Sequence, residues 1–169
     1  RPRVALRVGV VGHRAERLVG VDRDQLRTTL ERLLRQLREC AVAATADATH
    51  YRSDGPRLTL LTGMADGTDR DAVLAAHADA SWAVHAVLPF PLTSHNADSQ
   101  EALRTALEGC AEVTVLDGVA ARYDAYVPLA HVLVEQADVL VAVWDGERAR
   151  GVGGTAEVVE FVRARYHVD

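Results

Sequence analysis

Apolar and polar positions along this chain follow two different periods. Five short, nearly continuous apolar runs predict strands that are buried on both faces. Between them, leucine and alanine recur every three or four positions among polar residues, which predicts amphipathic helices. The predicted strands span residues 4–11, 58–62, 82–88, 112–116 and 138–144. The predicted helices span about residues 21–46, 70–80, 102–107, 122–136 and 155–166.

Strands and helices alternate five times, which is the order of an α/β domain with a parallel sheet. We therefore expect one Rossmann-like three-layer domain over residues 1–169, with a mainly parallel sheet of about five strands and helices on both faces. Asp66 or Thr68 is expected to cap the second helix, and Gly109 to end the third. Sheets of this kind bind ligands at the carboxyl ends of their strands.

The composition narrows the chemistry that this domain could perform. All 19 basic residues are arginine, so a Schiff-base lysine, a pyridoxal phosphate anchor and a Walker-type lysine are excluded. The formal net charge of −5 and the lack of a basic run argue against binding of duplex or single-stranded nucleic acid. The histidines show no ligand spacing, so no metal is expected, and no cofactor is predicted. Cys40 and Cys110 are expected to be small buried residues.

The chain carries no pattern typical of a membrane or secreted protein. No stretch approaches the roughly 20 apolar residues of a membrane span, and the N-terminus lacks a signal-peptide pattern. We therefore expect a cytoplasmic protein with no membrane contact in this domain. The chain begins with Arg1 rather than methionine, which suggests a piece of a longer protein. Its apolar helix faces suggest a homo-oligomer.

Glycine and polar residues follow four of the five predicted strands. Because parallel strands end at the same edge of a sheet, these residues are expected to meet on one rim and to bind the ligand. They are Gly12, His13 and Arg14 after the first strand, Gly63, Met64, Ala65, Asp66 and Asp69 after the second, Pro89 and Phe90 after the third, Trp144 as the last residue of the fifth, and Asp145 and Gly146 after it. Arg14 and His13 suit a phosphate, whereas Phe90 and Trp144 suit either a base or, more often at strand ends, the core.

The glycine-rich turn before the last helix is the strongest candidate for an anion site. Gly151, Gly153 and Gly154 permit successive backbone N–H groups to point to one place, and Thr155 adds a hydroxyl at the helix N-terminus. The alternative is an ordinary capped loop in which Glu157 complements the helix dipole. The position directly after a buried strand favours the anion site.

The segment TGMADGTD after the second strand is a further candidate. Its functional interpretation is a second group of backbone donors, with Asp66 or Asp69 accepting hydrogen bonds from sugar hydroxyls. The alternative is a capped turn between a strand and a helix. The first strand ends in GVVGHR, which lacks the Gly-x-Gly-x-x-Gly fingerprint, and this argues against a dehydrogenase that uses NAD(P).

Taken together, VGVVGHR, LLTGMADGTDRDA, AVLPFP, DVLVAVWDG and RGVGGTAEVV resemble the successive motifs of the SLOG superfamily, over residues 8–159. That group is named for DNA-processing Smf proteins and LOG phosphoribohydrolases. The resemblance implies a Rossmann-like domain with a nucleotide pocket at the strand ends. Members are either hydrolases that release a base from a nucleoside monophosphate or sensor modules that bind nucleotide signals and are joined to effectors.

The glycine turn departs from the motif of the hydrolase branch, Gly-Gly-x-Gly-Thr-x-x-Glu. Aligned on Gly154 and Thr155, the chain has Val152 in place of the second glycine and Val158 in place of the glutamate. Glu157 lies one residue earlier, which turns its side chain by about 100° around a helix. The phosphate-binding part of the motif is therefore retained, and the catalytic part is altered.

Two functions follow from this comparison. The first is a sensor module that binds a small nucleotide-derived signal, such as an ADP-ribose-type or cyclic nucleotide, and that is fused to or associated with an effector. The alternative is an enzyme that cleaves the N-glycosidic bond of a nucleoside monophosphate. Its catalytic candidates are Glu157, Asp69 and Asp66, because such cleavage needs a carboxylate near the sugar.

Overall fold

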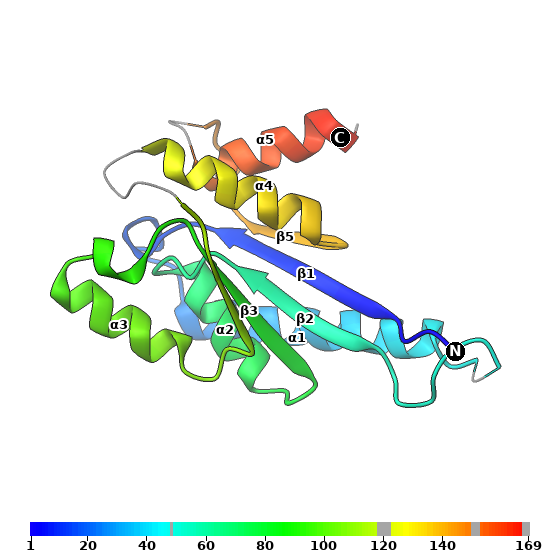
Figure 1. The fold of residues 1–169 in the computed structure, drawn as a ribbon. Coiled ribbons are helices and arrows are strands. Elements are labelled where there is room, and N and C mark those ends of the chain that lie inside the picture. Colours follow the sequence, from blue (N-terminus) through cyan, green and yellow to red (C-terminus); the bar gives the residue numbers. More distant parts are fainter. Residues whose placement is uncertain (48, 118–122, 150–152, 167–169) are drawn as a thin grey trace.

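The computed structural model describes residues 1–47, 49–117, 123–149 and 153–166. Within these residues, five strands form one sheet that lies between two layers of helices (Figure 1). The strands are β1 (Ala5–Gly12), β2 (Arg57–Thr62), β3 (Trp82–Leu88), β4 (Glu112–Val115) and β5 (Val139–Val143). The helices are α1 (Arg23–Ala44), α2 (Thr68–His77), α3 (Ala97–Leu107), α4 (Tyr126–Gln136) and α5 (Thr155–Tyr166). The predicted Rossmann-like α/β class is confirmed.

The order of the strands determines where the chain reverses its direction across the sheet. All neighbouring pairs are parallel, in the order β4-β3-β2-β1-β5. The chain moves outward from β1 to β4 and then crosses back to place β5 on the other side of β1. Because such crossovers are right-handed, α1 to α3 cover one face and α4 lies on the other, together with α5. The carboxyl ends of β1 and β5 therefore border the topological switch point.

Neighbouring residues of the central strands face opposite helix layers. Val10 and Leu60 are buried in the core on the side of α1 and α2. Val11 and Leu61 are buried in the second core, on the side of α4 and α5. Successive side chains of a strand point to opposite faces, so a strand that is covered on both faces is apolar throughout. This explains why the predicted strands were nearly continuous apolar runs.

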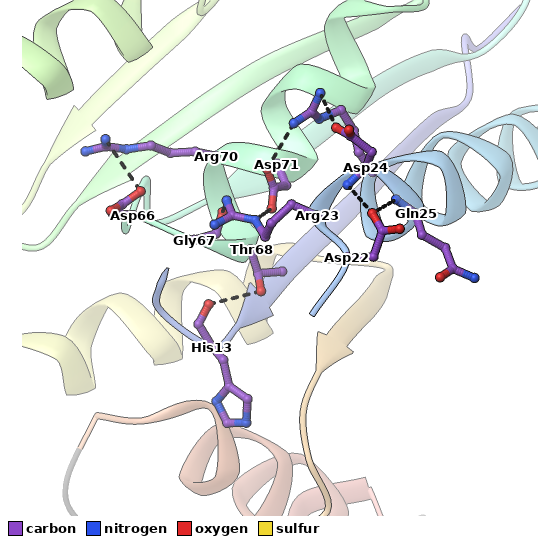
Figure 2. Close-up of polar contacts among 11 residues, drawn as sticks. His13, Asp22, Arg23, Asp24, Gln25, Asp66, Gly67, Thr68, Arg70 and Asp71 are labelled. Carbon is purple, nitrogen blue, oxygen red and sulfur yellow. Dashed lines mark hydrogen bonds and ion pairs between the residues drawn. The ribbon is translucent and has the colours of Figure 1, made fainter. Parts of the chain in front are cut away.

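A buried ion pair attaches α1 to α2. The Asp71 carboxylate is buried and accepts a hydrogen bond of 2.5 Å from Nε of Arg23, while Nη2 of Arg27 lies 3.8 Å from its other oxygen (Figure 2). The hydrogen bond to Asp71 is the main cause that raises the pKa of Arg23. Nη2 of Arg23 also donates to the backbone oxygen of Gly67 at 3.3 Å. Two arginines compensate for the burial of one carboxylate, and they hold the turn before α2 against α1.

The predicted cap of α2 is wrong. The N-cap residue is Gly67, which has φ 116° and ψ −131° and no side chain with which to cap. Thr68 lies inside the first turn, and its hydroxyl donates to the backbone oxygen of His13 at 3.0 Å. Asp66 precedes the cap, and its carboxylate lies 3.8 Å from Nη1 of Arg70. A contact with a distant loop thus takes the place of a local cap.

The prediction for the end of α3 is confirmed, and the prediction for one of the two cysteines is wrong. Gly109 has φ +84° just after α3 ends at Leu107, which confirms it as the end signal of that helix. Cys110 is partly buried and packs against the core, whereas Cys40 is exposed, contrary to expectation.

In the part of the chain that the structure describes, none of the helices has the length and apolar character needed to cross a membrane.

Candidate functional site

The loops that follow β1 and β2 are joined by backbone hydrogen bonds. The backbone oxygen of His13 accepts from the backbone N–H of Thr68 at 3.1 Å as well as from its hydroxyl (Figure 2). The N–H of Ala15 donates to the backbone oxygen of Asp66 at 3.1 Å, and Arg14 and Gly67 form an isolated antiparallel bridge. Two predicted site segments that are more than 50 residues apart in sequence therefore form one rigid unit.

The glycines of this unit are required by close packing. A Cβ on Gly12 would lie 2.5 Å from the Thr68 side chain, and a Cβ on Gly67 would lie 2.6 Å from the backbone oxygen of His13. A Cβ on Gly63 would lie 2.8 Å from the Leu129 side chain of α4. Gly12 and Gly63 were predicted as ligand residues, and the structure supplies a packing reason for both. Gly67, which the prediction omitted, is the most constrained of the three because its φ is positive.

A cavity of about 600 Å³ opens at the carboxyl ends of the strands. Its volume lies within the range of about 300–1,000 Å³ that is usual for small-molecule sites. Predicted residues from all three of the loops after β1, β2 and β3 line it, together with the start of α5. They are Gly12, His13, Arg14, Gly63, Met64, Ala65, Asp66, Asp69, Pro89, Phe90, Gly153, Gly154 and Thr155. The structure thus brings most of the predicted site together on one cavity.

Among the described arginines that line this cavity, Arg14 is the one without a carboxylate partner. Its guanidinium lies over the Tyr126 ring, 4.9 Å from the centroid, and it forms no ion pair with another described residue. The two other arginines of the cavity are paired: Nη2 of Arg17 donates to Asp145 at 2.9 Å, and Arg70 lies near Asp66. Arg14 therefore keeps its N–H donors for a bound anion.

Asp69 is a buried carboxyl group in the wall of the cavity. The residue is 7% exposed, and this burial raises the pKa of Asp69 to about 7. Hydrogen bonds from the backbone of Ala65 and from the Thr62 hydroxyl oppose the rise, as does the charge of Arg14. The Ala65 N–H donates to Oδ2 at 3.2 Å. Asp69 thus stabilises the turn after β2 and also titrates near neutral pH.

Asp145 connects the loops on both sides of the switch point. Its backbone N–H donates to Nε2 of His13 at 3.2 Å, and its carboxylate accepts from Arg17. The backbone N–H of Glu147 is the main cause that lowers the pKa of Asp145, with His13 and Arg17 adding to the effect. These contacts occupy the side chain, and Asp145 does not line the cavity. Its observed role is to join the loops after β1 and β5.

Three more predicted residues of the last loop and helix also lie outside the cavity lining. Trp144 donates from Nε1 to the backbone oxygen of Glu147 at 2.8 Å, and its ring is covered by Arg163, 5.6 Å away. Gly146 has φ +83° and open space around it. Glu157 accepts a hydrogen bond from the Gly153 N–H, four residues earlier in the turn before α5. Gly151 falls outside the described residues.

The start of α5 therefore combines the two interpretations of its glycine turn. Gly153, Gly154 and Thr155 line the cavity, so the helix N-terminus faces the ligand space. At the same time the Glu157 carboxylate takes one of the N–H donors of the turn, which was the alternative to an anion site. The remaining unpaired donors of the first turn and the helix dipole still favour an anion there.

Several residues of the cavity were missed by the strand-end argument. Tyr126 and Leu129 come from α4, which covers the sheet from the other face, and Arg70 lies in α2 beyond the turn. His95 belongs to the polar segment between β3 and α3, as do Ser94 and Asn96, and Ser99 lies in the first turn of α3. The run TSHNADS was a usable signal for these residues, because it places many polar groups shortly after a predicted strand. Nothing in the sequence of α4 singles out Tyr126.

No protein-family profile and no curated protein matches this chain.

Proposed function

We propose that this domain binds a nucleotide or a nucleotide-derived signal in the cavity, as a sensor module of the SLOG type. The observation that carries the proposal is that unpaired Arg14 and the N-terminus of α5 border the same cavity as the aromatic residues Phe90 and Tyr126. A cation and a helix N-terminus suit a phosphate group. Aromatic and apolar walls suit the rest of a nucleotide.

The ligands that fit the proposal best carry one or two phosphates on a nucleoside. ADP-ribose-type compounds and cyclic nucleotides belong to this class, and a fused or associated effector would respond to their binding. A homo-oligomer is part of the proposal because apolar side chains such as Val42 of α1 and Leu74 of α2 are exposed. Light scattering of the purified protein would determine its mass. The acidic net charge of −5 favours small anions held by specific groups over long polyanions.

Calorimetry against adenine nucleotides, cyclic nucleotides and ADP-ribose compounds tests the proposal. We expect saturable binding of at least one of them, and we expect Arg14→Gln to weaken it by about 10- to 100-fold, the usual effect of losing a charged hydrogen bond. Arg38→Gln is the matched control, since Arg38 pairs with Asp79 at 3.2 Å and does not line the cavity. If the folded protein binds none of these compounds, the proposal fails.

One observation favours the second candidate, an N-glycosidase. Asp69 lies in the cavity wall with a pKa of about 7, so it could protonate the departing base while water attacks the anomeric carbon. Chromatography of incubated nucleoside monophosphates for free base and ribose phosphate would detect the reaction. Loss of product release in Asp69→Asn, with release retained in Asp24→Asn, would support the enzyme, since Asp24 is exposed on α1 and does not line the cavity. An absence of product from the native protein would exclude it.

A further inference from the structure

Four side chains in the cavity wall form a continuous series of contacts. The Arg14 guanidinium lies 4.9 Å from the centroid of the Tyr126 ring, and the Phe90 ring meets Tyr126 edge to face with centroids 5.9 Å apart. On its other side, Phe90 contacts the His95 ring at a centroid distance of 4.8 Å. The series begins at the cation beside the switch point and ends at a histidine after β3. Each contact restricts the rotamer of the next ring.

His95 ends this series as a neutral, hydrogen-bonding group. Burial lowers the pKa of His95, and the positive charge of Arg70 lowers it further. Its ring nitrogens make no hydrogen bond to any other described residue, while its backbone oxygen accepts from Nε2 of Gln100 at 2.7 Å. A neutral imidazole has one N–H donor and one nitrogen acceptor. The Gln100 hydrogen bond thus holds the His95 main chain, while the two ring nitrogens of His95 remain available to a ligand.

The two ends of the cavity differ in the charged groups that border them. At the switch point lie the N-terminus of α5 and Arg14, which has no ion-pair partner among the described residues. Glu16 and the Arg17–Asp145 pair lie beside them. The segment from β3 into α3 contributes lining residues that carry no formal charge at neutral pH: Leu88, Pro89, Phe90, Ser94, His95, Asn96, Ser99 and Leu103. A ligand that spans the cavity therefore needs an anionic group at one end and a neutral, planar, hydrogen-bonding group at the other.

We propose that His95 is a specificity-determining residue that selects a neutral nucleobase on a ligand whose phosphate lies near Arg14. This inference rests on the proposed function and goes beyond it, because it assigns the base to the segment between β3 and α3. Nucleobase edges present donors next to acceptors, which one neutral imidazole can match. The contact with Phe90 holds the imidazole ring in place for this purpose.

Calorimetry with ribose 5-phosphate and the four common 5′-nucleoside monophosphates tests the inference. We expect the native protein to bind at least one nucleotide about tenfold more tightly than ribose 5-phosphate, the effect of one buried hydrogen bond plus ring contact. In His95→Ala this preference should fall below about threefold, with the affinity for ribose 5-phosphate changed by less than about twofold. His95→Gln, which keeps a donor and an acceptor, should retain part of the preference. His77→Ala is the control, since His77 is exposed on α2 and does not line the cavity.

The outcomes separate this inference from the function on which it rests. Equal affinity of the native protein for ribose 5-phosphate and every nucleotide, or an unchanged preference in His95→Ala, would overturn the role of His95 and leave the phosphate site standing. If the folded native protein binds none of the five compounds, the role of His95 fails; if it also binds none of the cyclic nucleotides and ADP-ribose compounds, the phosphate site fails with it. Retained binding of ribose 5-phosphate by His95→Ala shows that the variant is folded.

Discussion

Asp69 makes the stability of this domain depend on pH in an unusual direction. An unfolded aspartate has a pKa near 3.9, whereas the pKa of buried Asp69 is about 7. Between these values the folded protein keeps a proton that the unfolded chain has lost, so the free energy of unfolding falls as pH rises from about 4 to 7 and then levels off. Asp69→Asn should remove this component and raise the stability at pH 8 by as much as about 4 kcal/mol.

Urea unfolding at a series of pH values from 4 to 8 measures this effect. The matched control is Asp66→Asn, because the Asp66 side chain is 65% exposed and its substitution should leave the slope as in the native protein. Identical pH dependence in Asp69→Asn and the native protein would show that Asp69 is ionised when folded. In that case its suggested use as a general acid would also lose its basis.

Substitution of the Glu157 carboxylate separates the two proposed functions, a binding module and a hydrolase. The Glu157 side chain accepts from the Gly153 N–H at the start of α5, where negative charge competes with a bound phosphate. Glu157→Gln keeps the hydrogen bond and removes the charge, so we expect about two- to fivefold tighter phosphate binding by calorimetry. Glu160→Gln, one helical turn further along α5, serves as the control. A loss of binding or of turnover in Glu157→Gln would instead show that the carboxylate acts on the ligand.

At the level of elements, the contact between the turns after β1 and β2 depends on one glycine. Gly67 has φ 116°, and a Cβ there would meet the His13 oxygen at 2.6 Å, so Gly67→Ala should cost at least about 3 kcal/mol of stability and displace Arg14. Gly55→Ala is the control, because Gly55 has φ +74° but nothing within 4 Å, and it should cost about 1 kcal/mol. Urea unfolding measures both changes. If both variants lose the same free energy of unfolding, the close contact between residue 67 and the His13 oxygen adds nothing to the cost of the positive φ.

The elements themselves could be predicted because burial on both faces leaves a strong pattern. The third strand was predicted at residues 82–88 and is Trp82–Leu88, and the last helix agrees at Thr155–Tyr166. Local rules failed where a distant contact decides the conformation. Thr68 was expected to cap α2, yet its hydroxyl donates to His13, 55 positions earlier in the chain. Trp144 was expected to end the fifth strand, but β5 ends at Val143, and Arg163 of α5 covers the Trp144 ring.

The part of the candidate site that could be predicted is the part that follows from one rule, that ligands bind at the carboxyl ends of parallel strands. That rule finds residues such as Arg14 and Asp69, because it depends solely on the direction of parallel strands. It does not find Tyr126, which reaches the cavity from the first turn of α4 and contacts Phe90. It also does not reveal that the Asp145 carboxylate accepts from Arg17 and that the Asp145 backbone N–H donates to His13. These facts depend on side-chain packing, which periodicity does not encode.

At the scale of the whole molecule, residues from both helix layers line the cavity. Arg70 of α2 and Leu103 of α3 line it from one layer, and Leu129 of α4 and Thr155 of α5 line it from the other (Figure 1). A ligand that fills the cavity must therefore contact loops and helices on both sides of the sheet. Binding of this kind stabilises all of the contacting segments against local opening, by an amount set by ligand concentration and affinity.

Amide hydrogen exchange with the tightest ligand found by calorimetry tests this consequence. We expect slower exchange together in residues 12–17, 63–70, 88–96 and 153–158, because each range contributes to the cavity lining. The middle of α1, which does not line the cavity, should exchange as before and is the internal control. Protection confined to 153–158 would indicate an anion held at the helix end alone, on the outside of the domain. Protection of all four ranges requires one ligand that reaches from the N-terminus of α5 to the segment after β3, and that length is what a phosphate joined to a base through a sugar would supply.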